Sequence, residues 1–241
     1  MTSKPVNDLG QPVGAAMNDW TPPPFPPHQK LMGRYCHLEP LQADHHAQSF
    51  WSALSDDSSD ARWTYLPYGP FASFTDFEHW CREAEQSTDP QYYAVVVDEQ
   101  TVGIISYLRI VPAHGVIEVG HVHFSPRLAR TRAATETMYL LTKNAFELGY
   151  RRYEWKCDSC NLPSRAAATR LGFTYEGTFR QAAVYKGRSR DTTWFSIIDG
   201  DWKSGLKDMY EQWLDPSNFE ETAEQKVKLS DLTARFVHAK P

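Results

Sequence analysis

The spacing of hydrophobic and polar positions changes along the chain, and each spacing predicts a different element. Apolar residues at every second position predict strands, and apolar residues at every third or fourth position predict helices. Strands are predicted over residues 34–39, 92–97, 102–110, 117–124, 152–157, 174–186 and 191–198. Helices are predicted over 44–54, 74–84, a stretch that ends at Gly149, a short stretch from Asn161 to Gly172, and 206–214. Short connections between several strands favour an antiparallel meander, so we expect an α/β fold with a mixed, mostly antiparallel sheet.

One segment, Ser125–Glu136, joins the apolar run 116–124 to an amphipathic helix. A strand that ends at a helix N-terminus forms an anion site, because the first-turn N–H groups are unpaired and the helix dipole is positive there. Arg130 and Arg132 add two guanidinium groups that suit phosphate. Arginine near a helix start is also a common solvated charge, so this segment needs a second motif.

The second motif is Asn161-Leu162-Pro163-Ser164, which begins a short helix that Gly172-Phe173 ends. Glu118-Val119-Gly120-His121 precedes the basic segment, and Tyr175-Glu176-Gly177-Thr178-Phe179-Arg180-Gln181 follows the Gly-Phe pair. Together these motifs resemble the GNAT N-acetyltransferases, specifically their ribosomal-protein-modifying RimJ/RimL-like branch. The resemblance covers roughly residues 33–202 and implies a GNAT fold, in which helices flank a sheet with splayed strands.

The resemblance divides the chain into a proline-rich arm (1–32), a GNAT domain (33–202) and a C-terminal helix with a polar tail (203–241). The six residues Pro22-Pro23-Pro24-Phe25-Pro26-Pro27 cannot form a helix and have too few backbone donors for a sheet interior. We therefore expect an extended strap that Trp20 and Phe25 anchor to the domain, in preference to a proline ligand for a signalling partner.

Apolar residues at helical spacing near the C-terminus are expected to pack against the domain, and a homodimer face is the alternative use for them. They are Leu206, Met209, Tyr210, Trp213 and Leu214.

Charge, apolar runs and cysteine spacing limit the classes of partner that the chain is expected to bind. A net charge of −5 and a pI near 6.0 provide no field that would gather a nucleic acid. The sequence has neither an apolar run approaching the ~20 residues that span a membrane nor the layout of a signal peptide, so we expect a cytoplasmic protein with reduced thiols. Cys157-x-x-Cys160 lacks a second close pair, so no metal is expected.

The resemblance implies acetyl-CoA as co-substrate and direct transfer of the acetyl group to a primary amine, of a protein N-terminus or of a small molecule. A longer donor such as succinyl-CoA remains open. Backbone groups around Val122 and Phe124 would pair with the pantetheine, and Asn161 would reach the pantetheine or the acyl end. The turn expected to cradle the pyrophosphate comprises Arg130, Thr131, Arg132, Ala133, Ala134 and Thr135.

The chain departs from the family at this turn, because Arg130 and Arg132 stand where glycines allow the backbone to approach phosphates. The substitutions either reshape the pocket, with loss of cofactor binding, or add cations to the backbone amides. We favour binding, because two cations attract a pyrophosphate.

Catalysis requires an acid for the leaving thiolate and a base for the amine. Ser164 matches the thiolate-protonating serine of RimL-like enzymes, although it could simply cap its helix. The glutamate base of those enzymes is replaced by Ala183, so we rank Glu118 first and His121 second as substitutes, with His123 nearby. Strand alternation places both histidines on one face and Glu118 on the other, unless Gly120 marks a bulge.

The connection 56–72 carries Trp63, Tyr65, Tyr68 and Phe71, and in the family this region forms one wall of the acceptor site. It could equally be a packed lid. Two other functions compete with catalysis: a non-catalytic acyl-CoA-binding module, and a scaffold that binds a protein partner through the arm and the aromatic connection without binding acyl-CoA.

Overall fold

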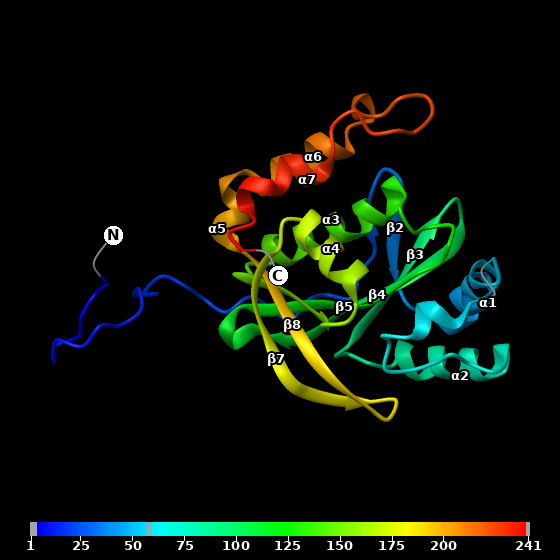
Figure 1. Cartoon of the computed structure of the whole chain (residues 1–241), viewed down its shortest axis with the longest axis horizontal. Helices are drawn as coiled ribbons and strands as arrows, with labels where there is room; N and C mark the ends of the chain where they lie inside the picture. The colour runs from blue at the N-terminus through cyan, green and yellow to red at the C-terminus, as the bar shows by residue number, and fades with distance from the viewer. Residues whose placement is uncertain (1–3, 57–58, 240–241) are drawn as a thin grey trace.

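The structure is a computed structural model that describes residues 4–56 and 59–239. Parts of three expected segments lie outside the described residues, namely 1–3 of the arm, 57–58 of the aromatic connection and 240–241 of the tail. The described chain forms one eight-stranded sheet with helices on both faces (Figure 1).

The expected α/β fold with a mixed, mostly antiparallel sheet is confirmed. The strands are β1 (Leu31–Met32), β2 (His37–Pro40), β3 (Gln91–Val97), β4 (Gln100–Val111), β5 (Val116–Phe124), β6 (Arg152–Asp158), β7 (Thr174–Tyr185) and β8 (Arg188–Ile198). The helices are α1 (Ala43–Leu54), α2 (Phe74–Glu85), α3 (Arg132–Glu147), α4 (Leu162–Arg170), α5 (Asp199–Asp201), α6 (Lys207–Leu214) and α7 (Leu229–Thr233). In the strand order β1-β2-β3-β4-β5-β6-β8-β7, only β5 and β6 run parallel, because α3 crosses over between them.

Hydrophobic side chains fill two cores, one on each face of the sheet. α3 and α4 cover one face, and α1 and α2 cover the other (Figure 1). The core under α3, which we call the α3-side core, includes Tyr107, Ile117, Val119, Leu141, Trp155 and Phe173. The core under α1 and α2, which we call the α1-side core, includes Phe50, Trp63, Phe77, Tyr92 and Ile104.

The first main strand is shorter than its alternation predicts. The prediction covered 34–39, but β2 begins only at His37. The backbone N–H groups of residues 34–36 donate instead to the Glu136 carboxylate of α3, at 2.6 to 2.9 Å. These donors are bound to a buried side chain, so they are not available to a neighbouring strand.

The final hairpin is longer than predicted. Its turn is only Lys186-Gly187, and β8 begins at Arg188 instead of residue 191. Both turn residues have positive φ, 48° and 70°, as in the tight turns that match strand twist. The hairpin extends beyond the rest of the sheet, and β7 forms its edge (Figure 1).

The proline arm lies against the domain from Trp20 to His28, but one expected anchor is wrong. Phe25 is 46% exposed, whereas Pro23 and Pro26 are buried. The prolines are held through their carbonyl oxygens, because proline has no N–H to donate, and His28 Nε2 bonds to the Tyr92 carbonyl at 2.7 Å. The Pro26 carbonyl accepts from Gln91 Nε2 at 2.9 Å, and the Pro24 carbonyl accepts from the Tyr150 hydroxyl at 3.1 Å.

The C-terminal segment is more ordered than the expected polar tail. α7 buries Leu229, and the turn after it buries Phe236, both in the α3-side core. The Thr233 hydroxyl donates to the Arg170 carbonyl at 3.0 Å. The apolar face of 206–214 is buried in the same core, so packing against the domain is confirmed and the proposed dimer face is already covered.

Candidate active site

The site lies where β5 and β6 separate. Their pairing runs from Val116↔Arg152 to Val119↔Trp155, and no later pair joins them among the described residues. Beyond that point β5 stays paired with β4, whereas β6 stays paired with β8. The opening leaves the β6-facing backbone edge of β5 without a strand partner, as extended-chain binding requires.

A β-bulge in β5 changes which side chains face which core. His123 lies opposite Ile104 and Gly120 lies opposite Ser106, so β5 has one extra residue between the two pairs. The extra residue is His121, with a left-handed φ of 50°. The simple alternation, which separated the histidines from Glu118, therefore does not hold, and the exception expected from a bulge near Gly120 applies.

All three candidate bases lie on the same face of the sheet. His121 and His123 contact aromatic rings of the α1-side core. Glu118 points to this face too, because its neighbours Ile117 and Val119 are buried in the α3-side core. Val122 and Phe124 pack against the α3-side core. The strand opening thus has a face that carries the candidate bases and a face that meets the start of α3.

The turn between β5 and α3 keeps a glycine-like backbone without glycine. Arg130 is exposed and has a φ of 67°, which is the left-handed conformation that glycine adopts without strain. Thr131 caps α3, and its hydroxyl accepts the Ala134 N–H at 3.1 Å. The N–H groups of Arg132 and Ala133 have no partner within the helix, as expected for its first turn.

The two arginines of this turn have different surroundings. The Arg132 guanidinium lies over the Tyr35 ring at 5.0 Å and over the Phe219 ring at 4.7 Å. The Thr135 hydroxyl is buried and accepts from Arg170 at 3.3 Å. Arg130 is therefore the more accessible cation at the start of α3, and Arg132 is held by aromatic faces.

The start of α4 brings Asn161 and Ser164 together. The Asn161 side-chain carbonyl caps α4 and accepts the Ser164 N–H at 3.1 Å. The Ser164 hydroxyl oxygen accepts the Trp155 indole N–H at 3.0 Å. An oxygen that accepts from a fixed indole still carries its own hydrogen, which Cys157 also approaches, so this geometry allows Ser164 to act as an acid.

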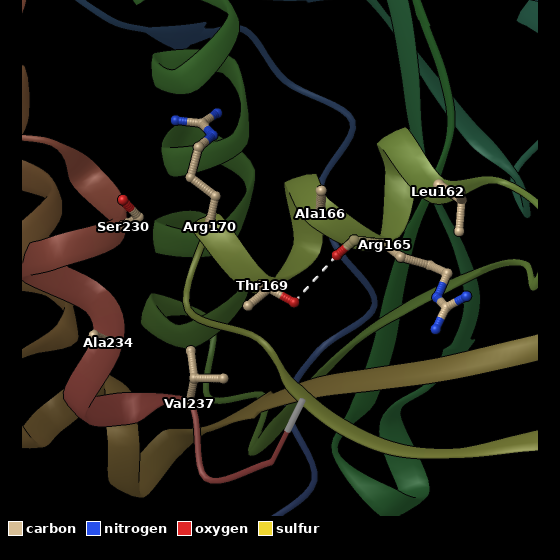
Figure 2. Close-up of a pocket in the computed structure, with 8 residues that line it drawn as sticks. All are labelled: Leu162, Arg165, Ala166, Thr169, Arg170, Ser230, Ala234 and Val237. Atoms are coloured by element: carbon tan, nitrogen blue, oxygen red, sulfur yellow. Dashed lines mark hydrogen bonds between the residues drawn. The ribbon is translucent and has the colours of Figure 1, made fainter. Parts of the chain in front are cut away.

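A pocket of about 450 Å³ lies on the outer side of α4, between it and the C-terminal segment (Figure 2). Its lining comprises Leu162, Arg165, Ala166, Thr169, Arg170, Ser230, Ala234 and Val237. In Figure 2 the Arg165 guanidinium points away from the C-terminal segment, and that of Arg170 points toward α3. The rest of the lining carries no charged side chain.

Glu118 is buried in a row of ion pairs that crosses the sheet. Its carboxylate lies 2.7 Å from Arg109 on one side and 2.7 Å from Lys156 on the other. Lys156 also pairs with Glu154 at 2.8 Å and lies over the Trp194 ring at 3.7 Å. Burial raises the pKa of the Glu118 carboxyl, while both cations oppose that rise. The carboxylate is thus paired with two cations, of which the Lys156 side chain is buried and that of Arg109 is exposed.

His121 has a different environment. Its ring stacks on Tyr68, at 5.6 Å between centroids, and contacts Tyr92 at 5.2 Å. Its Nδ1 is buried without a hydrogen-bond partner among the described residues. Burial and, secondarily, Arg109 lower the pKa of His121 to about 4, so the ring is neutral at pH 7. A neutral imidazole with an unoccupied nitrogen can accept a proton.

His123 is enclosed more completely. Its ring lies 4.1 Å from that of Trp63 and 5.1 Å from that of Phe50. Burial and, secondarily, Arg62 lower its pKa to about 3. The side chain is part of the α1-side core, which favours a structural role.

Sequence reasoning missed a hydrogen-bonded pair at the opening, Asp158 and Tyr185. Asp158 ends β6, is 7% exposed, and accepts the Tyr185 hydroxyl at 2.9 Å and the Cys160 N–H at 2.8 Å. Tyr185 comes from the hairpin turn region, far along the chain. A carboxylate at the end of a strand beside Cys160-Asn161 was the available signal, but its tyrosine partner depends on the three-dimensional path of β7.

The aromatic connection reaches across the opening. Its Tyr65 hydroxyl donates to the Cys160 carbonyl at 3.1 Å, and its Trp63 carbonyl accepts from Lys186 Nζ at 2.6 Å. Trp63 and Tyr68 are themselves packed in the α1-side core. The connection therefore is packed like a lid and also forms a wall beside the opening.

These features define a class: an α/β transferase fold whose parallel strand pair opens next to a helix N-terminus. A sequence profile of the acetyltransferase (GNAT) domain matches residues 36–174, and the chain belongs to this family, whose members use acetyl-CoA. A GCN5-related N-acetyltransferase from Brucella melitensis is 42% identical, with a TM-score of 0.88 over 90% of this chain and 100% of that one. A probable GNAT-family acetyltransferase from Chromobacterium violaceum is 44% identical, with a TM-score of 0.75 over 80% and 98%.

More distant structures share the fold alone. An acetyltransferase from Salmonella typhimurium, described as modifying the N-terminal serine of ribosomal protein L7/L12, is 18% identical, with a TM-score of 0.61 over 70% of this chain and 99% of that one. No curated protein matches the chain. Within 4–56 and 59–239, no helix is long and apolar enough to cross a membrane, and no cluster of three His, Cys, Asp or Glu side chains could hold a metal ion.

Proposed function

We propose that this protein is an acetyl-CoA-dependent N-acetyltransferase that acts on a primary amine. The observation that carries the proposal is the opening between β5 and β6, with the free first turn of α3 at one side and Ser164 at the other. The RimJ/RimL-like motifs favour a protein N-terminus over a small amine as acceptor.

The residues present fit the cofactor. The edge of β5 at Val122 and Phe124 has no strand partner and suits the amide groups of a pantetheine arm, and the Phe124 carbonyl also accepts from Arg62 Nη1 at 3.2 Å. Arg130 and the turn from Thr131 to Thr135 suit the pyrophosphate, through side-chain charge and backbone N–H groups. Asn161 caps α4 with its carbonyl, which leaves its NH₂ group for the acyl end.

In this proposal acetyl-CoA supplies the activated acetyl group, and the chain moves the protons. His121 Nδ1 accepts the proton of the amine, which becomes strongly acidic as the nitrogen forms its new bond, so a weakly basic imidazole suffices. The Ser164 hydroxyl donates its hydrogen to the leaving sulfur while Trp155 holds its oxygen. Glu118, ranked first from the sequence, instead holds Lys156 and Arg109 in place.

Thermal unfolding with acetyl-CoA, succinyl-CoA, free coenzyme A and no ligand tests the cofactor. A ligand that binds only the folded state stabilises it by about 2.7 kcal/mol at 100 times its Kd. A shift with acetyl-CoA, followed by transfer to an N-terminal serine peptide, supports the enzyme. A shift without transfer to any amine tested would favour the non-catalytic acyl-CoA-binding module, for which the absent base at Ala183 is the supporting observation. No shift with any thioester would contradict both.

A further inference from the structure

The outer half of the β7–β8 hairpin concentrates positive charge in an acidic protein. Residues 179–191 contain Arg180, Lys186, Arg188 and Arg190 against the single carboxylate of Asp191, whereas the whole chain has a net charge of −5. We call these five residues, with Phe179, the basic hairpin surface. Such local concentration of one charge sign attracts a partner of opposite sign.

The cations of this surface are available to a partner. Arg180 and Arg188 are exposed, and neither forms an ion pair within the described part of the chain. Lys186 is exposed too, but its Nζ donates to the Trp63 carbonyl. The Asp191 carboxylate is used locally, because it accepts the Gln181 N–H at 2.7 Å. The charge on the hairpin is therefore not neutralised by the chain itself.

A large apolar side chain is exposed among these charges. Phe179 is 57% exposed and shares its hairpin face with Tyr185 and Arg188, whereas Val184, 79% exposed, lies on the other face. A large apolar side chain among unpaired cations fits a polypeptide, which presents carboxylates and apolar groups together. A nucleic acid backbone presents a more uniform line of phosphates, and the net negative charge of the chain opposes it.

The surface borders the acceptor side of the opening. Lys186 at the hairpin turn donates to the Trp63 carbonyl, and Tyr185 donates to Asp158 at the end of β6. A polypeptide whose N-terminal amine lies at the opening would run directly onto the hairpin.

We propose that the basic hairpin surface binds an acidic polypeptide segment immediately following the acceptor amine. This deepens the proposed function, on which it rests, by naming the substrate class: a protein or peptide N-terminus followed by Asp and Glu residues. Arg180 and Arg188 contact its carboxylates, and Phe179 contacts its apolar side chains.

The test is direct binding of labelled peptides by fluorescence anisotropy, without cofactor. An N-terminal serine peptide with four Asp or Glu residues is compared with the same peptide carrying Asn and Gln. We expect the double variant Arg180→Gln/Arg188→Gln to bind the acidic peptide about tenfold more weakly, the equivalent of about 1.4 kcal/mol. Its affinity for the neutral peptide should be unchanged. Binding of the acidic peptide should also weaken as salt rises.

The matched control is Lys203→Gln/Lys207→Gln, which removes the same charge near α6, at the opposite end of the molecule from the hairpin turn (Figure 1). Equal weakening in both double variants, or equal affinity of wild type for both peptides, overturns the proposal. Tighter binding of a single-stranded 12-mer oligonucleotide than of the acidic peptide also overturns it, in favour of a nucleic acid. Thermal shifts with acetyl-CoA on the same proteins report separately on the proposed function, because neither double variant touches the turn before α3.

Discussion

His121 shows how one backbone conformation decides the chemistry of a strand. Its left-handed φ of 50° inserts a residue into β5, and the insertion turns both histidines toward the α1-side core. There, aromatic neighbours bury the ring and lower its pKa to about 4. Without the bulge, His121 would point toward the α3-side core.

Replacement of His121 tests its role as base. We expect His121→Gln to lower kcat/KM by about 10²- to 10⁴-fold, because the proton of the amine loses its acceptor. The matched control is His123→Gln, two residues along the same strand, which we expect to lower stability and leave kcat/KM unchanged. Initial rates between pH 5 and 9 provide the measurement. In wild type, kcat/KM should not fall around pH 6.5, because burial lowers the pKa of His121 to about 4. Equal activity in wild type and His121→Gln would contradict the assignment.

Ser164 allows a similar separation of roles. Ser164→Ala removes the proposed acid and leaves the Trp155 N–H without its acceptor, so we expect kcat to fall about 10²-fold or more and stability to fall by about 1–3 kcal/mol. Trp155→Phe removes the indole donor and keeps the hydroxyl, and should lose stability with a smaller loss of kcat. Single-turnover rates and urea unfolding of both variants give the comparison; a parallel loss of kcat in both would indicate that Ser164 has only a structural role.

Buried histidines also set the response of stability to acid. Burial lowers the pKa of His28, His46, His121 and His123, so each binds a proton more readily in the unfolded chain. Their stabilisation is complete above the unfolded pKa of 6.5 and is lost as pH falls toward 4 for His121 and 3 for His123. Each group contributes a slope of at most about 1.4 kcal/mol per pH unit.

Urea unfolding at pH 7 and pH 5 measures this slope. Wild type should be several kcal/mol less stable at pH 5, and the His121→Gln/His123→Gln variant should show a smaller difference between the two pH values. An identical difference in both proteins would mean that these two histidines do not carry the pH dependence.

At the scale of elements, the periodic segments were predictable and their local interruptions were not. The helices α1 and α2 and the meander of β3, β4 and β5 follow from apolar spacing, with ends displaced by one or two residues. The start of β2 was predicted too early, because Glu136, about 100 positions away, binds the N–H groups of residues 34–36. The Asp158–Tyr185 contact was missed for the same reason: it joins segments that only the fold brings together.

The turn between β5 and α3 keeps a glycine-like backbone with an arginine side chain. Arg130→Gly should relieve the left-handed strain and raise the free energy of unfolding by up to about 1 kcal/mol, since extra unfolded-state freedom offsets part of the gain. It should weaken acetyl-CoA binding, because a phosphate contact is lost. Arg130→Asn separates the effects, since asparagine tolerates the conformation without the charge: both variants should bind acetyl-CoA equally weakly. Calorimetric titration measures affinity, and unchanged affinity in both would exclude a role for the Arg130 charge.

At the scale of the whole molecule, the C-terminal segment joins parts of the domain that the sequence does not connect. The Phe219 ring lies against the Arg132 guanidinium at the start of α3. The Thr233 hydroxyl donates to the Arg170 carbonyl at the end of α4, and the Ala239 carbonyl accepts the Tyr175 N–H of β7. Its polar composition predicted a tail, because few apolar residues mark it. Those few, above all Leu229 and Phe236, are almost fully buried, and burial of a few large side chains is enough to fix a segment.

Truncation of one of these side chains tests whether the segment belongs to the cooperative unit. Leu229 is 1% exposed, so Leu229→Ala should lower the free energy of unfolding by about 2–5 kcal/mol through lost burial and the cavity it leaves. Val227→Ala, in the same segment at 39% exposure, should have a much smaller effect. If the segment folds together with the domain, urea unfolding of Leu229→Ala stays a single transition at lower urea, monitored by both fluorescence and circular dichroism. A separate transition at low urea, with the midpoint of the main transition unchanged, would show that the segment unfolds independently. The segment would then contribute nothing to the stability of the first turn of α3.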